Sequence, residues 1–208
     1  MSTTGLKRGR PKQTDLSYDD TKEELMRIGL VALTSTGFVG TGLEPMLRQA
    51  KIPKGSFYHY FESKEAFGLA LLSRYRSYFE NKLDKHLLNG AVPPLARLQN
   101  FMDDARQGME KYAFERGCLV GNLEQEAHFL SDAMRFALCQ TYQSWQDKVS
   151  TCLYLAQRQG TLAEAADIEA LAHVFWVGWE GAVSRARLLK SSSPLQQFEA
   201  FYLTGLPR

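Results

Sequence analysis

Apolar residues recur with the spacing of a helix face along nearly the whole chain, and no segment alternates convincingly with the period of a strand. The segment from Leu25 to Ala32 is an example, because Leu25, Ile28 and Ala32 stand at positions i, i+3 and i+7. Residues at these positions form one apolar stripe along a helix. The pattern therefore predicts an all-α fold for the 208-residue chain.

Glycine and proline divide this periodic sequence into separate helices. Gly37 is expected to end the first helix, because glycine adopts the left-handed conformation of a helix terminus without steric cost. Pro53 suits the first position of the third helix, since the N–H that proline lacks has no partner there. We predict three helices with a tight break between the second and third, which is the layout of a helix-turn-helix. Further helices are predicted over residues 63–88, 95–114, 119–129, 131–159, 167–190 and 195–203.

The stretch PKGSFYHYF separates aromatic side chains from small polar ones. At about 100° per residue, Phe57, Tyr60 and Phe61 fall on one side of a helix. Gly55 and His59 fall on the opposite side. We therefore expect the rings to anchor this helix to its neighbours and the polar side to project outward.

The excess of basic residues is concentrated at the N-terminal end. Residues 1–64 contain ten Lys or Arg and seven Asp or Glu, a net charge of +3, whereas the remaining residues have a net charge of −1. Residues 1–16, which include KRGRPKQTD, are predicted to form a flexible basic arm with nothing to bury. The RGRP segment, with Arg8 and Arg10, resembles the core of an AT-hook, whose arginines lie in a narrow A·T minor groove. The alternative is a basic tail that only aids solubility.

Three features of the N-terminal third are typical of one family: Gly37-Phe38 after the first helix, the stretch PKGSFYHYFESKEAF, and the long helix that follows. On these residues the chain resembles transcriptional repressors of the TetR family. Two later segments, GCLVGNLEQE and FWVGWEGAVSRARL, look similar to the subgroup that includes the AcuR and NemR regulators, which respond to acrylate and to reactive electrophiles. The resemblance implies a homodimer with two small DNA-binding domains and larger ligand-binding domains that pair through their last helices.

The chain is expected to contain the arm, a helix-turn-helix domain over residues 17–63, and a helical ligand-binding and dimerisation domain over residues 64–208. A recognition helix needs small polar groups near its start and an apolar back. Gly55 lets the backbone approach a duplex, and Ser56 can hydrogen-bond to either kind of base pair. The alternative is a surface cluster with a solvated charged face. The residues predicted to contact DNA are Arg8, Arg10, Thr41, Arg48, Lys54, Gly55, Ser56, Tyr58, His59 and Lys64.

Cys118 is the most prominent candidate in the second half of the chain. It follows an Arg-Gly pair between two predicted helices, and a helix N-terminus would lower the pKa of its thiol and raise its reactivity. One interpretation is a sensor thiol attacked by an electrophile or oxidant. The other is a small, buried apolar residue. Residues of the following helices could line a ligand pocket with it, or could simply form the core. The predicted pocket residues are Cys118, Asn122, Tyr142, Trp145, Trp176, Trp179 and Glu180.

Small residues recur every four positions in the helix predicted over residues 167–190. Gly178, Ala182 and Ala186 would let another helix approach closely. We predict that they form the dimer interface, with packing inside one protomer as the alternative.

The sequence gives little support to an enzyme with a phosphate or metal site, to a secreted protein or to a membrane protein. The chain has no phosphate-binding glycine loop, and its four histidines show no metal-ligand spacing with its cysteines, so we expect no metal and no cofactor. No targeting signal and no apolar run long enough for a membrane are visible, and the three cysteines form no close pair, which favours a reducing cytoplasm. A thiol enzyme using Cys118 and His128 stays open, because spatial neighbours cannot be read from sequence.

We therefore predict a cytoplasmic, homodimeric regulator that binds a palindromic double-stranded DNA operator and is released by a small-molecule inducer. The family resemblance favours a repressor, and it implies an inducer that is acrylate-like or electrophilic. Two other hypotheses stand beside this one. The first is a helical thiol-dependent enzyme that uses Cys118, and the second is a DNA-binding adaptor without a small-molecule ligand.

Overall fold

All the regular structure in the described part of the chain is helical, which confirms the predicted all-α fold. The computed structural model describes residues 18–208. Within this range, no helix combines the length and apolar character that crossing a membrane requires. In chain order the elements are α1 (Tyr18–Gly40), α2 (Leu43–Gln49), α3 (Lys54–Tyr60), α4 (Lys64–Leu87), α5 (Pro94–Lys111), α6 (Leu119–Gln125), the short 3₁₀ helix η1 (Ala127–Phe129), α7 (Asp132–Arg158), α8 (Ile168–Leu189) and α9 (Ser193–Gly205).

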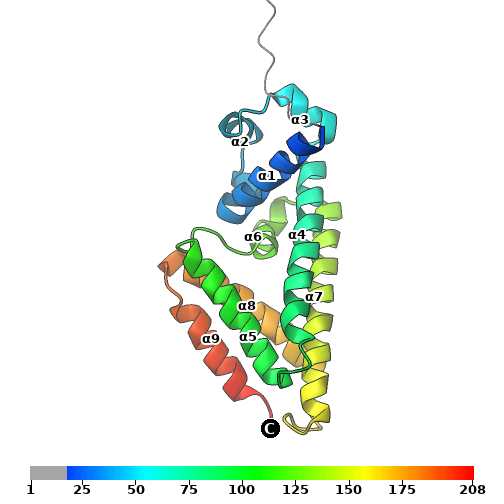
Figure 1. Ribbon diagram of the computed structural model, residues 1–208, viewed down its shortest axis with the longest axis vertical. Coiled ribbons are helices and arrows are strands. Elements are labelled where there is room, and N and C mark those ends of the chain that lie inside the picture. The colour runs from blue at the N-terminus through cyan, green and yellow to red at the C-terminus, as the bar shows by residue number, and fades with distance from the viewer. Residues whose placement is uncertain (1–17) are drawn as a thin grey trace, which may run out of the picture.

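The helices form a small unit and a larger one (Figure 1). Helices α1, α2 and α3 gather at one end of the elongated molecule, as a helix-turn-helix domain requires. Helix α4 runs from this end alongside α7, and α5, α8 and α9 lie at the other end. Helix α6 lies between α1 and the larger unit and contacts α1, α4 and α7. The two units are therefore joined by the chain at α4 and by packing at α6.

A cluster of phenylalanine rings anchors α3 to its neighbours. Phe57 is fully buried and Phe61 nearly so. Their ring centroids lie 5.3 and 4.8 Å from that of Phe67 in α4. Tyr60 is half-buried on the same helix. Since large rings supply much of the burial energy of a small domain, these contacts fix the orientation of α3. The prediction that its aromatic side faces inward is confirmed.

Helix α1 continues past Gly37, where we predicted its end, but only through a kink. The φ and ψ angles of Gly37 are 78° and 178°, which are not helical. Glycine tolerates this positive φ because it has no Cβ. Beyond the kink, the N–H groups of Phe38 and Val39 donate to the carboxylate of Glu126, at 2.7 and 3.1 Å. The kink thus turns the end of α1 toward the larger unit.

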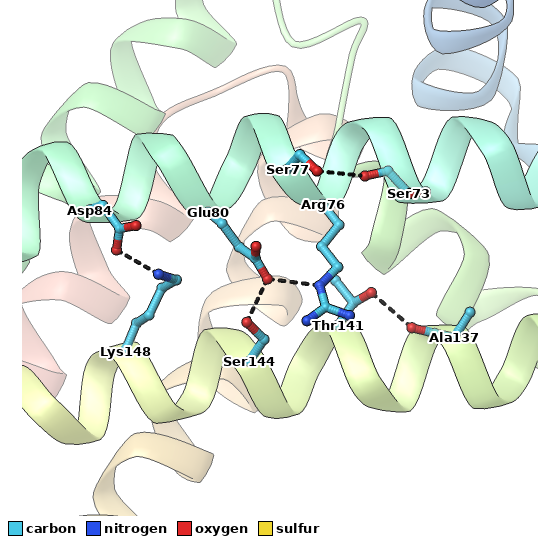
Figure 2. A network of polar contacts seen from close by, with 9 residues as sticks. All are labelled: Ser73, Arg76, Ser77, Glu80, Asp84, Ala137, Thr141, Ser144 and Lys148. Atoms are coloured by element: carbon cyan, nitrogen blue, oxygen red, sulfur yellow. Dashed lines mark hydrogen bonds and ion pairs between the residues drawn. The ribbon is translucent and has the colours of Figure 1, made fainter.

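Polar pairs join α4 to α7 along their length (Figure 2). Lys148 of α7 donates to Asp84 of α4 over 2.6 Å. The Glu80 carboxylate accepts hydrogen bonds from Ser144 of α7 and from Arg76 of its own helix. These pairs hold the two long helices in one register, beside a core of large rings. The core includes Phe79, Phe101, Trp145, Trp176 and Trp179.

The small residues of α8, predicted to form the dimer interface, pack within the protomer, as the alternative interpretation has it; their role in a dimer stays a prediction. Ala186 is fully buried and Ala182 nearly so. A Cβ built on Gly178 would lie 2.2 Å from Cε2 of Phe198 in α9, so this ring occupies the place of the missing side chain. The small residues therefore let α9 pack close to α8.

Gly178→Ala should destabilise the protein by about 1–3 kcal/mol, because the added methyl group forces Phe198 or the two helices apart. Gly108→Ala is the matched control, since Gly108 lies inside α5 and a Cβ there meets nothing within 4 Å. The control should stabilise the protein by up to about 1 kcal/mol through helix propensity. Urea denaturation followed by circular dichroism measures both variants. A Gly178→Ala midpoint equal to that of the wild type would contradict the packing of α9 on α8.

Candidate DNA-binding surface and ligand cavities

The outward side of α3 is open along its length. A Cβ built on Gly55 has nothing within 4 Å, and Lys54 and His59 are exposed. Tyr58 is 51% exposed, and Ser56 beside it is half-buried. These five residues, all predicted to contact DNA, therefore lie together on a helix whose aromatic side is buried. A duplex could approach them without any rearrangement of the small unit.

Two of the predicted cations lie close to this surface. Arg48 is exposed in the last turn of α2, and Lys54 pairs with Glu44 of α2 over 2.6 Å. Exposed ion pairs of this kind contribute little to stability, so a DNA phosphate can replace the Glu44 carboxylate. Arg8 and Arg10 lie outside the described residues, and their minor-groove contact stays a prediction.

Thr41 and Lys64, both predicted to contact DNA, have partners inside the protein. Thr41 is only 6% exposed, and its hydroxyl donates to the carbonyl oxygen of Gly37 over 2.5 Å. The Lys64 ammonium donates to the carbonyl oxygen of Phe38 over 2.6 Å and lies 4.6 Å from the centroid of the Phe38 ring. Burial lowers the pKa of Lys64. Both side chains hold the kinked end of α1.

The residues predicted to form one ligand pocket fall around two separate hollows. The α6–α8 cleft has a volume of about 880 Å³ and lies between α6, α7 and α8. The α1–α4 cavity has a volume of about 410 Å³ and lies between α1, α4, α5 and α8. Both volumes suit a small organic ligand. The lining of the cleft includes Gly121, Glu124, Tyr142, Gln143, Trp176 and Glu180. The lining of the cavity includes Val31, Tyr75, Met109, Arg116, Cys118 and Glu180.

Glu180 borders both hollows and is a buried acid between them. It is 8% exposed, and its Oε1 has no hydrogen-bond partner among residues 18–208. Burial raises the pKa of the Glu180 carboxyl to about 7; a hydrogen bond from Cys118 opposes the rise, and the negative charge of Glu124 adds to it. The carboxyl can therefore gain or lose a proton near neutral pH, next to either hollow.

Cys118 is a buried, protonated thiol, which favours the second of the two interpretations, a small buried residue. Burial is the main reason that the pKa of Cys118 lies well above its usual value, and the charge of Glu180 adds to the rise. The thiol hydrogen-bonds to Glu180 and to Tyr75. In the described range no contact joins it to His128, which is exposed on η1. Sequence analysis missed Tyr75, because its helical spacing marks only a buried position.

The other predicted pocket residues divide into lining and core positions. Tyr142 and Trp176 line the cleft, and the Tyr142 hydroxyl donates to Glu124 over 2.6 Å. Trp179 lines the α1–α4 cavity. Trp145 is fully buried within the aromatic core and lines neither hollow. A ligand can therefore reach three of these four side chains.

A set of hydrogen bonds, which we call the α6 clasp, joins the larger unit to the end of α1 through Asn122, Glu126 and Arg187. Asn122 donates to two carbonyl oxygens of α1, at 2.9 and 3.0 Å. Arg187 of α8 donates to the side-chain oxygen of Asn122 and to the carbonyl oxygen of Ser35, both over 2.8 Å. Glu126 accepts from the two N–H groups that follow the Gly37 kink. Asn122, which we predicted to line the ligand pocket, thus links the two units and lines neither the cleft nor the cavity.

An exposed helix-turn-helix surface, clasped to a helical domain with two hollows, defines a DNA-binding regulator. Residues 94–202 match the family described as Tetracyclin repressor-like, C-terminal domain. The chain is 45% identical to the transcriptional regulator AcuR of Cereibacter sphaeroides over 193 residues, which cover 92% of this chain and 87% of that protein. It is 32% identical to the HTH-type transcriptional repressor NemR of Escherichia coli K12 over 85% of this chain and 89% of that protein.

Solved structures agree with these matches. The crystal structure of the regulatory protein TetR from Rhodobacter sphaeroides superposes with a TM-score of 0.87 at 43% identity, covering 89% of this chain and 98% of that chain. The reduced form of E. coli NemR superposes with a TM-score of 0.80 at 31% identity, covering 88% and 95%. The chain belongs to the TetR family of transcriptional regulators, and within it resembles AcuR and NemR.

Glu180→Gln should change the pH dependence of stability. Because the pKa of Glu180 is raised on folding to about 7, the folded state binds the proton more tightly than the unfolded state. Wild-type stability should therefore fall as the pH rises from about 4.5 through about 7. Glutamine stays neutral at every pH. The free energy of unfolding of the variant should therefore rise relative to that of the wild type as the pH approaches 8, by at most about 3 kcal/mol. Urea denaturation near pH 5 and near pH 8 measures this difference, and a difference independent of pH would contradict the burial of an ionisable carboxyl.

Proposed function

We propose that the protein is a repressor that binds a palindromic operator as a homodimer and leaves it when a small molecule enters the larger unit. The observation that carries this proposal is the open polar side of α3, backed by buried rings, in a chain of the TetR family. Because its partner is DNA, the protein works in the cytoplasm. Its role in this proposal is binding rather than catalysis.

In this proposal α3 enters the major groove of the operator. Gly55 lets the main chain approach the bases, and Ser56 hydrogen-bonds to a base edge. Tyr58 and His59 are long enough to bind phosphates on the groove walls. Lys54 and Arg48 add phosphate contacts, and Arg8 and Arg10 of the N-terminal arm would add contacts in the minor groove.

An exposed apolar stripe on α8 and α9 supports the homodimer. Val174, Val177 and Leu188 of α8 are 55%, 64% and 73% exposed, and Phe201 of α9 is 79% exposed. At about 100° per residue, the three α8 residues share one side of the helix. A second copy packed on this stripe would remove it from water. The two α3 helices must then stand roughly 34–36 Å apart to enter successive major grooves.

The α6 clasp supports a route from ligand to DNA. Helix α6 carries Gly121 in the wall of the cleft, and its N-cap Cys118 lines the α1–α4 cavity. The same helix and the residue that caps its end hold α1 through Asn122 and Glu126. A ligand that favours a displaced α6 would therefore displace α1 and, with it, α3. Such a ligand shifts the population of dimers toward a spacing that misfits the operator.

We assign the inducer to the α1–α4 cavity and expect a small acid or electrophile of acrylate-like kind. The cavity wall includes Arg27, Arg74 and Arg116. Arg27 and Arg74 pair with Glu24 and Glu23 in exposed ion pairs, which a ligand carboxylate could replace, and Arg116 lies over the ring of Tyr112. Cys118 also lines it, as a protonated thiol. An acid is therefore better supported than an electrophile that needs a thiolate. NemR, one of the relatives, was solved in a form described as reduced. Oxidants therefore belong among the candidate inducers to be tested.

Tyr58→Ala and His59→Ala should each weaken operator binding about tenfold or more, because each removes a contact to the duplex. Tyr154→Ala is the matched control, since Tyr154 is 46% exposed in the C-terminal part of α7, outside the helix-turn-helix. Fluorescence anisotropy with promoter fragments measures the affinities, and sedimentation velocity confirms that the variants stay dimeric. Wild-type affinity in both α3 variants would rule out α3 as the recognition helix.

Glu126→Gln should uncouple the inducer from the operator, because an amide accepts the two N–H groups beyond the Gly37 kink less strongly than a carboxylate does. With acrylate as the probe, the loss of operator affinity should be at least fivefold smaller in the variant than in the wild type. The affinity for acrylate itself should change little. Glu80→Gln, which alters a carboxylate shared by α4 and α7, is the control and should respond as the wild type does. A full response in Glu126→Gln would contradict the clasp as the route.

A further inference from the structure

We propose that the α6–α8 cleft is a second ligand site and that it takes an organic cation, either an amine or a quaternary ammonium ion with an apolar body. The cleft is distinct from the α1–α4 cavity proposed for the inducer. Helix α8 stands between the two, and among the described residues Glu180 is the one lining residue that they share. The cleft is also about twice as large, at about 880 against 410 Å³.

Two acidic groups line the cleft, one buried and one exposed. Glu180 is buried there, and its Oε1 has no hydrogen-bond partner among residues 18–208. Glu124 lies at the exposed rim and accepts the hydroxyl of Tyr142. A buried carboxylate without a partner is costly, because water no longer solvates its charge. Cys118 hydrogen-bonds to this carboxyl but leaves Oε1 without a partner, and a cation in the cleft would offset the cost by interacting with that oxygen.

The basic side chains of the cleft stand away from Glu180. Arg185 lines the cleft but is exposed, and it lies about 140° around α8 from Glu180 at about 100° per residue. His173 lies two helical turns away along α8, is exposed, and contacts Gln146 over 3.4 Å. Neither residue places a fixed positive charge against the buried carboxyl. The position is therefore available to a charge brought by a ligand.

Aromatic rings beside the carboxyls provide the second element of cation recognition. Trp176 stands one turn before Glu180 on α8, and Tyr142 faces the same cleft from α7. The face of an aromatic ring attracts a cation through its quadrupole, and it also accepts the apolar groups that an organic cation carries. The amide side chains of Gln143 and Gln146 complete a neutral polar border. A small metal ion would not use the rings or the volume, whereas an organic cation uses both.

The outer border of the cleft lies on the apolar stripe of α8. Val177 and Leu188, which belong to that stripe, also line the cleft. In the proposed homodimer the second copy would cover this side and shield an occupant from water, which strengthens its attraction to Glu180. This enclosure depends on the proposed dimer, whereas the arrangement of acids and rings belongs to one protomer.

Isothermal titration calorimetry on the full chain tests the proposal with phenyltrimethylammonium as the probe. Its neutral isostere, tert-butylbenzene, has carbon in place of the charged nitrogen and is the control ligand. We expect the cation to bind at least tenfold more tightly than the isostere. Glu180→Gln, which keeps the shape of the side chain, should remove most of this preference. Equal affinities for the two ligands, or an unchanged preference in Glu180→Gln, would overturn the proposal.

Two matched variants locate the site, because Gly181 borders the cleft, Gly108 borders the α1–α4 cavity, and a Cβ on either meets nothing within 4 Å. Gly181→Leu should reduce probe binding at least tenfold, and Gly108→Leu should leave it unchanged. Gln143→Phe fills the same cleft from α7 and replaces Gly181→Leu if circular dichroism shows that this variant is unfolded. The reverse pattern would place the cation in the other cavity and refute the assignment.

Sedimentation velocity and operator binding separate this proposal from the proposed function. If the probe dissociates the dimer, the cleft belongs to the second protomer and the ligand site is refuted. Loss of operator binding in α3 variants with normal titration of the probe would leave the cation site standing. A protein that binds its operator but not the probe would refute only the cation site.

Discussion

The contact between α6 and the end of α1 is the interaction on which the proposed communication between the two units depends. Main-chain groups at a helix end lack partners within their own helix. In α1 these groups are bound by side chains of the larger unit, Asn122, Glu126 and Arg187. The kink at Gly37 is part of this contact, because it presents two N–H groups to one carboxylate. A shift of α6 would therefore act directly on the backbone of the DNA-binding unit.

Glu180 gives the two hollows of the larger unit a shared wall. Burial raises the pKa of its carboxyl to about 7, so the carboxyl is partly ionised near neutral pH. In the scheme that we propose, a cation in the α6–α8 cleft would favour the ionised form, whereas an acid in the α1–α4 cavity would favour the protonated form. Two ligands of opposite charge would thus influence each other through one proton. By linkage, each would change the affinity for the other by the same factor.

Much of the fold could be predicted from the sequence, because helical periodicity and breaks at glycine and proline are local signals. The inward side of α3, with Phe57 and Phe61, follows from spacing alone and is confirmed. The candidate site was predicted less well. The sequence left Cys118 open between a reactive thiol and a buried apolar residue, and burial and a neighbouring acid decide its pKa. Glu126 and Arg187 were missed, since their main-chain partners lie 88 and 152 residues away in sequence.

The sequence by itself determined the helices, the two sides of α3 and the family, because each depends on residues close together in the chain. Tertiary structure alone decided which small residues face a neighbouring helix of the same protomer, as Gly178 does. It also decided that Thr41 and Lys64 hydrogen-bond to carbonyl groups at the end of α1. It further divided one expected pocket into two hollows on either side of Glu180. The physical reason is the same in each case: burial, charge and hydrogen-bond partners are set by distant segments, which local patterns do not record.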